Sequence, residues 1–251
     1  MLGNISLDMF VMRKKKSSYV IALLMFGAAV VFSLIEKVTM SNGSEDTDGT
    51  FISVFSSNVS TCCLFFGIFF VMFACTDLKN GYIKNIAGSV SSRMGYILSK
   101  ETALAVYILL ALALNALGAV VGSTLFLNGI GDLDASDFLV YTAELYVLLL
   151  GFMSLIVFFV FLMRNSTGPM IIAVLLGTNL FGNTFYRLIA MLLAKADIEF
   201  KSNYISVSGQ LASVRPGADG KDILVTIAVG AAYIVIFNLL TWIAMEKKDI
   251  A

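Results

Sequence analysis

The 251-residue sequence contains no histidine, which excludes several kinds of site. Ser-His-Asp and Cys-His catalysis, histidine-ligated metal centres and pH sensing by imidazole all need that side chain. Proline occurs only twice, and 14% of the residues are charged, against roughly 25% in soluble domains. Hydrophobic residues make up 59% and the mean hydropathy is +0.90. A water-soluble fold is therefore disfavoured, and helices in lipid are favoured.

Other features are scarce in ways that narrow the function. The three cysteines, Cys62, Cys63 and Cys75, form no CxxC pair and have no metal-binding neighbours in the sequence, so we interpret them as packing residues. The formal net charge is zero, so overall charge does not favour nucleic acid as a partner. No phosphate-binding glycine loop occurs, so this chain is not expected to bind ATP or another cofactor. No catalytic constellation is present, which argues against an enzyme.

Long apolar runs dominate the rest of the chain. A helix needs about 20 apolar residues to cross a hydrocarbon core of roughly 30 Å. Six segments meet that length, which predicts an all-α integral membrane protein with a single transmembrane domain over residues 1–251. The predicted spans are Ser18–Ile35, Val54–Cys75, Thr102–Leu127, Phe138–Met163, Pro169–Leu193 and Ile223–Met245.

The placement of lysine and arginine predicts the orientation of these spans. Basic residues gather at Arg13–Lys16, in the loop after the second span, at Arg164, and at Lys247 and Lys248. The loop after the first span carries Glu45, Asp46 and Asp48, and the loop after the third carries three aspartates with no lysine or arginine. Both termini are therefore predicted to lie in the cytosol. Arg13–Lys16 and the following apolar run also resemble a signal peptide, but the length of the run and the five later spans favour an uncleaved anchor.

Two further segments are neither spans nor simple loops. Residues 1–17 have apolar side chains at helical spacing, with Asp8 and the basic cluster off that face. This pattern predicts an amphipathic helix on the inner membrane interface, the alternative being a disordered tail. Residues 194–222, predicted to lie outside, are too few for a domain and too apolar for a free linker. They either dip back into the membrane or cap an outer vestibule, and periodicity does not decide between strand and helix.

The cytosolic loop at residues 76–101 has a distinct pattern. Apolar residues at 83, 86, 87 and 90 predict a short helix with one apolar face. Ser91 or Ser92 can cap a second helix, which continues through Arg93 and Lys100 into the third span. A short amphipathic helix between two spans either docks into a soluble partner and transmits its movement, or lies at the lipid interface.

The residues of this loop resemble the coupling-helix region of type-2 ABC exporter permeases. They read as an acidic residue, then Lys-Asn-Gly, Ile-Lys-Asn, Ser-Arg and Ser-Lys at the head of the third span, although Gly88-Ser-Val replaces the proline-containing turn common in the family. The likeness extends to chain length, six spans, cytosolic ends, the N-terminal helix and the segment between spans five and six. Within the family the chain is most similar to bacterial exporters of amphipathic peptides, such as the phenol-soluble modulin exporter, and to lantibiotic-immunity permeases. The resemblance assigns ATPase coupling to Asp77, Lys79, Gly81, Lys84, Arg93 and Lys100.

That resemblance also implies partners. A separate nucleotide-binding ATPase subunit would bind ATP and Mg²⁺, and a second copy or a related permease would complete the membrane part. The exported substrate would be an amphipathic peptide or a hydrophobic antimicrobial compound. The alternative is an autonomous secondary transporter or channel, which the lack of paired broken helices in corresponding halves disfavours.

Polar side chains within the predicted spans suggest a second site. Glu144 in span four and Arg187 in span five would lie at similar depth, so we expect them to pair or to face an outer vestibule. Asn183, Asn179 and Tyr186 extend the polar surface of span five. This stripe either lines a translocation route or holds helices together through hydrogen bonds. Five phenylalanines of span two likewise fit either a substrate surface or lipid-facing packing: Phe65, Phe66, Phe69, Phe70 and Phe73.

Overall fold

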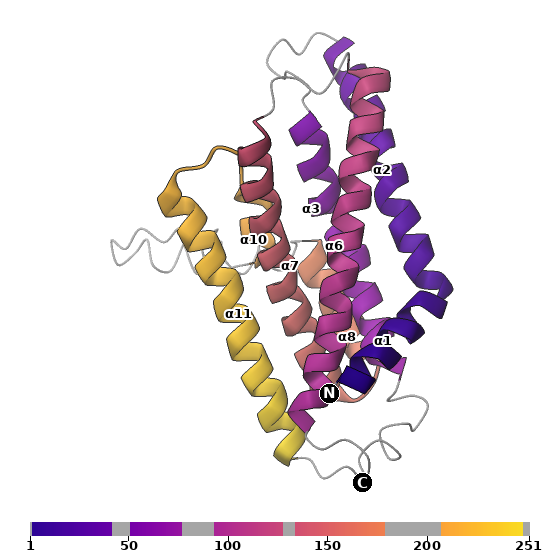
Figure 1. The fold of residues 1–251 in the computed structure, drawn as a ribbon, viewed down its shortest axis with the longest axis vertical. Helices are drawn as coiled ribbons and strands as arrows, with labels where there is room; N and C mark the ends of the chain where they lie inside the picture. The colour runs from indigo at the N-terminus through magenta and orange to yellow at the C-terminus, as the bar shows by residue number, and fades with distance from the viewer. Residues whose placement is uncertain (1, 42–50, 77–92, 128–133, 179–206, 248–251) are drawn as a thin grey trace.

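The computed structural model describes residues 2–41, 51–76, 93–127, 134–178 and 207–247. Within these ranges the chain is helical, with short turns and no strand, which confirms the all-α prediction for the described residues (Figure 1). The helices are α1 (Leu2–Lys14), α2 (Lys16–Ser41), α3 (Phe51–Ala74), α6 (Arg93–Phe126), α7 (Ala135–Met163), α8 (Thr167–Gly177), α10 (Val207–Ser213) and α11 (Gly220–Lys247).

The described helices supply four or five candidate membrane spans. α2, α6, α7 and α11 are each long and apolar enough to cross a bilayer. α3 is a fifth if its two parts, Phe51–Val59 and Cys63–Ala74, which meet at 40°, form one span. The predicted span Pro169–Leu193 is described only as far as Thr178, and the 11 residues of α8 are too few to cross alone. The described chain is therefore that of an α-helical membrane protein with four or five candidate spans, and the sixth span stays a prediction.

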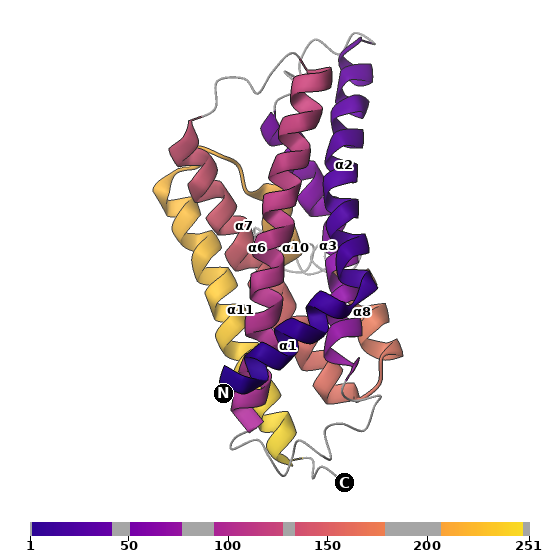
Figure 2. The same cartoon turned by 45° about the vertical axis from the view of Figure 1, so that its right-hand side comes forward.

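The long helices run along one another, while α1 crosses them. α2 lies beside α6, α11 lies beside α7, and α1 passes obliquely over the first turns of α6 before the chain turns into α2 (Figure 2). Lys100 of α6 contacts Asp8 of α1, and the adjacent Glu101 contacts Asn238 of α11. The N-terminal helix and the last part of α11 therefore lie at the same end of the bundle.

Glycines allow the close helix contacts. Gly151 of α7 and Gly230 of α11 face each other, and a Cβ on Gly151 would lie 3.1 Å from the Gly230 carbonyl oxygen. Gly177 of α8 is as close to α3, because a Cβ there would lie 2.7 Å from the Leu64 Cα. Lipid tails are as apolar as leucine, so helices in a membrane associate through such close packing and through hydrogen bonds.

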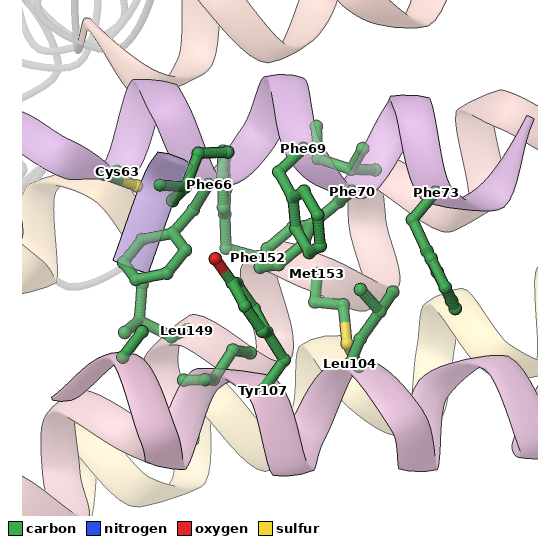
Figure 3. Packing of buried hydrophobic residues seen from close by; sticks show 14 of the residues in the cluster. Cys63, Phe66, Phe69, Phe70, Phe73, Leu104, Tyr107, Leu149, Phe152 and Met153 are labelled. Carbon is green, nitrogen blue, oxygen red and sulfur yellow. The ribbon is translucent and has the colours of Figure 1, made fainter. Parts of the chain in front are cut away.

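The phenylalanines of α3 form the centre of the core (Figure 3). Phe66, Phe69, Phe70 and Phe73 are fully buried, and the Phe69 ring lies 4.4 Å from that of Tyr107. The lipid-facing interpretation is therefore wrong for these four residues, because α2, α6, α7, α8 and α10 surround α3. Phe65 alone of the five is exposed, at 38%.

The cysteines agree with the sequence interpretation where they are described. Cys63 and Cys75 are buried and form no disulfide. The Cys75 thiol contacts the Asn165 carbonyl oxygen at 3.5 Å. Both side chains therefore act in packing, as predicted, whereas the side chain of Cys62 lies outside the described part.

Two asparagines join α2, α3 and α6 inside the bundle. The Asn58 amide donates to the Met25 carbonyl oxygen at 2.7 Å and to Asn115 Oδ1 at 2.5 Å. The Asn115 amide in turn donates to the Phe55 carbonyl oxygen at 3.1 Å. Both asparagines are fully buried. They act as interhelical hydrogen-bonding residues, a role that the sequence did not single out.

We expect Asn115→Leu to destabilise the protein moderately. The substitution removes one donor and one acceptor from a buried network, and interhelical hydrogen bonds in membranes contribute about 0.6–2 kcal/mol each. Thermal unfolding of the purified protein in detergent measures the loss. Thr61→Val is the matched control, because the exposed Thr61 hydroxyl bonds only within its own helix, to the Ser57 carbonyl oxygen. An Asn115→Leu protein as stable as this control would contradict the expectation.

The start of α7 is explained by a local cap. Asp134 caps α7, its carboxylate accepting from the Ser136 backbone N–H at 3.0 Å. That bond, together with the Ser136 hydroxyl, lowers the pKa of the Asp134 carboxyl. In the predicted outer segment 194–222, Val207–Ser213 form α10 and the chain enters α11 at Gly220, so the described part of the segment contains helix and no strand.

α10 lies within the bundle. Val207, Gln210 and Leu211 are buried, and α10 packs against α7, α3 and α11. Gln210 Oε1 accepts from the Thr226 hydroxyl at 3.2 Å. Thr226 lies about 9 Å along the helix axis from the start of α11, at a rise of about 1.5 Å per residue. The described part of the segment therefore packs against the spans, and both alternatives for the whole segment stay predictions.

Candidate functional site

The coupling residues predicted from the sequence fall partly outside the described part of the chain. Asp77, Lys79, Gly81 and Lys84 belong to the segment 77–92, which is not described. The backbone of Arg93 begins α6, as predicted, but its side chain is not described. Lys100 is described in full. The structure therefore describes the residues on either side of the segment 77–92 and the contacts that hold them.

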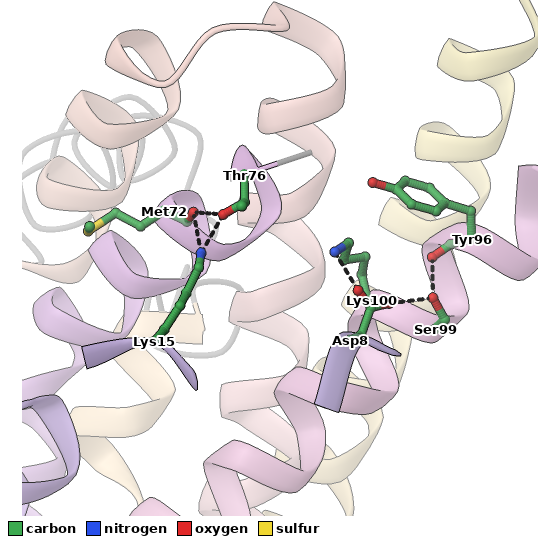
Figure 4. Close-up of polar contacts among 7 residues, drawn as sticks. All are labelled: Asp8, Lys15, Met72, Thr76, Tyr96, Ser99 and Lys100. Carbon is green, nitrogen blue, oxygen red and sulfur yellow. Dashed lines mark hydrogen bonds and ion pairs between the residues drawn. The ribbon is translucent and has the colours of Figure 1, made fainter. Parts of the chain in front are cut away.

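The start of α6, after the segment 77–92, is held to α1 by a buried ion pair. Lys100 Nζ lies 2.5 Å from Asp8 Oδ1, and the two side chains are 1% and 4% exposed. The Ser99 hydroxyl donates to Asp8 Oδ2 at 2.7 Å, so both carboxylate oxygens are bonded (Figure 4). The ammonium also lies 4.8 Å from the centre of the Phe73 ring. Lys100 is thus turned into the protein and cannot present its charge to a soluble partner.

The end of α3, before the segment 77–92, is held by a lysine of the N-terminal region. Lys15 stands at the turn between α1 and α2, and its Nζ donates to the Met72 carbonyl oxygen at 3.2 Å (Figure 4). It also donates to the Thr76 hydroxyl. Met72 belongs to the last turn of α3, and Thr76 is the second residue beyond it. Lys15 therefore fixes the point from which the segment 77–92 departs.

Together these contacts form one unit, which we call the α1 clamp. The N-terminal part of the chain, α1 and the adjoining Lys15, bonds both to the end of α3 and to the start of α6. A displacement of the α3 end of the segment 77–92 must therefore move α1 and α2 or break the Lys15 hydrogen bonds, and a displacement of the α6 end must move α1 or break the buried ion pair. The α1 clamp consists of Asp8, Lys15, Met72, Thr76, Ser99 and Lys100.

The clamp corrects one detail of the predicted N-terminal helix. Residues 2–14 are helical, as expected, which removes the alternative of a disordered tail. Asp8, however, is not on the outward polar face: it is buried against α6, and Leu7 and Phe10 are exposed. The reason is that Lys100 and Ser99 satisfy the carboxylate, which makes its burial tolerable. Asp8 and Lys100 are 92 residues apart in the sequence, so no local pattern signalled this pair.

The start of α6 also holds α11. The Asn238 amide donates to Glu101 Oε2 at 2.7 Å, and both side chains are buried. Adjacent residues of α6, Lys100 and Glu101, thus bind α1 and α11 respectively. Neither Asn238 nor Asp8 was singled out as a contact of this region by sequence reasoning. The entry to α6 is the point at which the N-terminal and C-terminal helices meet.

The second predicted site is described only at Glu144. Its side chain is 2% exposed, and Oε1 has no hydrogen-bond partner among the described residues. Asn179, Asn183, Tyr186 and Arg187 lie outside the described ranges. The Glu144–Arg187 pair and the polar stripe of span five therefore stay predictions.

Comparison with protein families decides the class of this membrane protein. Residues 11–179, about two thirds of the chain, match the profile of the ABC-2 family transporter proteins. The chain belongs to the ABC-2 transporter family. Members of this family are membrane components of ABC transporters and usually work with an ATPase subunit. A comparison with curated proteins found no match.

The ABC-2 match includes most of the α1 clamp. Lys15, Thr76, Ser99 and Lys100 lie within residues 11–179, together with the whole segment 77–92. In this ABC-2 protein, the residues that match the family therefore include the end of α3 and the start of α6, which flank the predicted coupling segment.

Proposed function

We propose that the chain is the permease subunit of an ATP-driven exporter that moves an amphipathic peptide or a hydrophobic antimicrobial compound out of the cell. A separate nucleotide-binding subunit would hydrolyse ATP with Mg²⁺. A second copy of this chain, or a related permease, would complete the membrane part. The protein would lie in the plasma membrane. The distribution of lysine and arginine places both termini and the segment 77–92 on the cytosolic side in this proposal.

The α1 clamp is the observation that supports this proposal best. A coupling segment transmits force only if its ends do not slide independently of the spans. Here Lys15 joins the end of α3 to the α1–α2 turn, and the buried Asp8–Lys100 pair joins α1 to the start of α6. A push on the segment 77–92 would thus reach α1, α2, α3 and α6 together. Through Glu101 and Asn238 it would also reach α11.

Co-purification tests the proposal directly. Tagged protein isolated from native membranes should bring down an ATPase subunit, and Lys84→Glu with Arg93→Glu should reduce the recovered ATPase by about tenfold or more. The reason is that reversing charges in an electrostatically complementary contact replaces attraction by repulsion, which costs several kcal/mol.

Lys221→Glu is the matched control for the charge reversals. Lys221 is exposed near the start of α11, at the end of the bundle opposite to Asn238 and Glu101. The Lys221→Glu substitution should leave the amount of recovered ATPase unchanged. The proposal fails if no ATPase accompanies the protein, or if Lys221→Glu lowers the yield as much as the other two reversals do.

The competing function is transport without an ATPase. The buried Glu144, whose Oε1 has no described hydrogen-bond partner, is the observation that favours it, because intramembrane carboxyls often bind coupling ions. Purified protein reconstituted alone in liposomes distinguishes the two. Transport driven by an ion gradient would support the alternative, whereas transport that needs the partner and ATP would support the exporter.

A further inference from the structure

A groove opens where α1 diverges from the axis of α2. It has a volume of about 670 Å³ and lies between α1, α2 and α6. Small-molecule sites typically measure about 300–1,000 Å³, so the groove is large enough for a ligand. Its walls include the apolar side chains of Met9, Phe10, Leu110 and Leu114. We call it the α1 groove.

The walls of the α1 groove face the surroundings of the bundle. Phe10 is 59% exposed, Tyr19 61% and Leu110 58%. In a protein that spans a membrane, these side chains contact lipid unless another protein covers them. An apolar groove at this position is therefore accessible to lipid hydrocarbon.

Polar groups at the floor of the groove are already satisfied. The Tyr107 hydroxyl donates to the Ser18 carbonyl oxygen at 2.9 Å, and the Ser18 hydroxyl donates to the Met12 carbonyl oxygen at 2.8 Å. On the exposed wall, the Tyr19 hydroxyl donates to the Arg13 carbonyl oxygen at 2.8 Å. The floor thus offers an incoming chain apolar surface and few free hydrogen-bonding groups.

One end of the α1 groove is basic. Arg13 lines it, and the neighbouring Lys14 and Lys16 are exposed. No carboxylate of the described residues pairs with the Arg13 guanidinium. The nearby Asp8 is committed to Lys100 and Ser99, and Glu101 is bonded to Asn238. The α1 groove therefore combines an apolar length, which we call the trough, with a positively charged end at Arg13.

From this combination we propose that the α1 groove binds one anionic phospholipid of the inner leaflet, with an acyl chain along the trough and the headgroup at Arg13. Basic pockets between helices at the cytoplasmic face suit such headgroups. The choice of leaflet rests on the cytosolic N-terminus proposed above. A second copy of this chain fits less well, because its described carboxylates at this end of the bundle are already bonded. A lipid here would brace α1 against α2 and α6, next to the α1 clamp.

Native mass spectrometry of the purified full chain in detergent tests the site independently of export. Dioleoyl phosphatidylglycerol and dioleoyl phosphatidylcholine, which differ in headgroup charge, are added at equal concentration. The protein should retain one phosphatidylglycerol in preference. Arg13→Gln should lower that retention about fivefold, the effect of removing one cation near an anionic surface, whereas Arg13→Lys should keep the preference. Lys221→Gln, at the other end of the bundle, is the charge control.

A second pair of variants tests the trough. Ala113→Trp fills the groove and should lower retention of both lipids, whereas Ala231→Trp, on the exposed face of α11, should not. Comparable thermal unfolding of the two tryptophan variants shows that folding is not the cause. Equal retention of the two lipids by the wild type would overturn the proposal. So would unchanged binding in Arg13→Gln or Ala113→Trp, or a dimer that forms without lipid and that Ala113→Trp disrupts.

Discussion

Asp8→Leu should destabilise the protein by about 3–5 kcal/mol, the usual cost of removing one partner from a buried ion pair. The substitution leaves the Lys100 ammonium, 1% exposed, without the carboxylate that it now binds at 2.5 Å. Ser99 loses the same acceptor. Because α1 is held to α6 through this carboxylate, we also expect loss of transport. Thermal unfolding in detergent and a transport assay measure the two effects.

A double variant separates charge from packing in this prediction. Asp8→Leu combined with Lys100→Met removes both charges and should regain most of the lost stability, because a buried pair can often be replaced by apolar residues of similar size. Asp137→Leu removes an exposed acid in the first turn of α7 and should change little. If Asp8→Leu alone unfolds at the wild-type temperature, the buried ion pair does not stabilise the protein as argued.

Gly118→Ala should destabilise the contact between α2 and α6 by about 1–3 kcal/mol, the usual range for overpacking. A Cβ at this position would lie 2.5 Å from the Phe26 carbonyl oxygen and 3.1 Å from the Phe26 Cα. Both are backbone atoms, so relief requires the whole of α2 to shift. Thermal unfolding of the purified variant measures the effect, and Gly27→Ala, which has open space around it on α2, is the control.

Gly122→Ala tests the same contact in a way that can be reversed. The added Cβ would clash with the Ser33 side chain, and a clash with a side chain can be removed by a second substitution. Ser33→Gly should therefore recover part of the loss in Gly122→Ala, whereas it should not help Gly118→Ala. Rescue of both variants, or of neither, would contradict this account of how α2 and α6 meet.

Sequence reasoning predicted the features that depend on local pattern. Apolar runs of sufficient length gave α2, α6, α7 and α11, because a lipid environment requires each span to satisfy its own backbone. The entry of the chain into α6 at Arg93 also agrees with the structure. Helical spacing predicted α1, although it assigned Asp8 to the wrong face. These results follow from neighbours along the chain, which the sequence displays directly.

The candidate site was less predictable because its contacts join distant positions. Lys100 was assigned to ATPase coupling by resemblance, and its side chain is buried against Asp8. The phenylalanines of α3 fitted lipid as well as core until the surrounding helices were known. Nothing in the spacing of Asn58 or Asn115 revealed that they bond to each other. In each case the side chain's environment depends on which helices are adjacent, and many helix arrangements satisfy the same apolar pattern.

By itself, then, the sequence determined that this is a helical membrane protein, since hydrophobicity acts on each segment separately. Only the tertiary structure decided that α1 binds the ends of both α3 and α6, through Lys15 and through Asp8 with Lys100. Burial of those polar groups becomes favourable only when the partners meet in space, so no local pattern can encode the α1 clamp. The same divergence of α1 from α2 also creates the α1 groove.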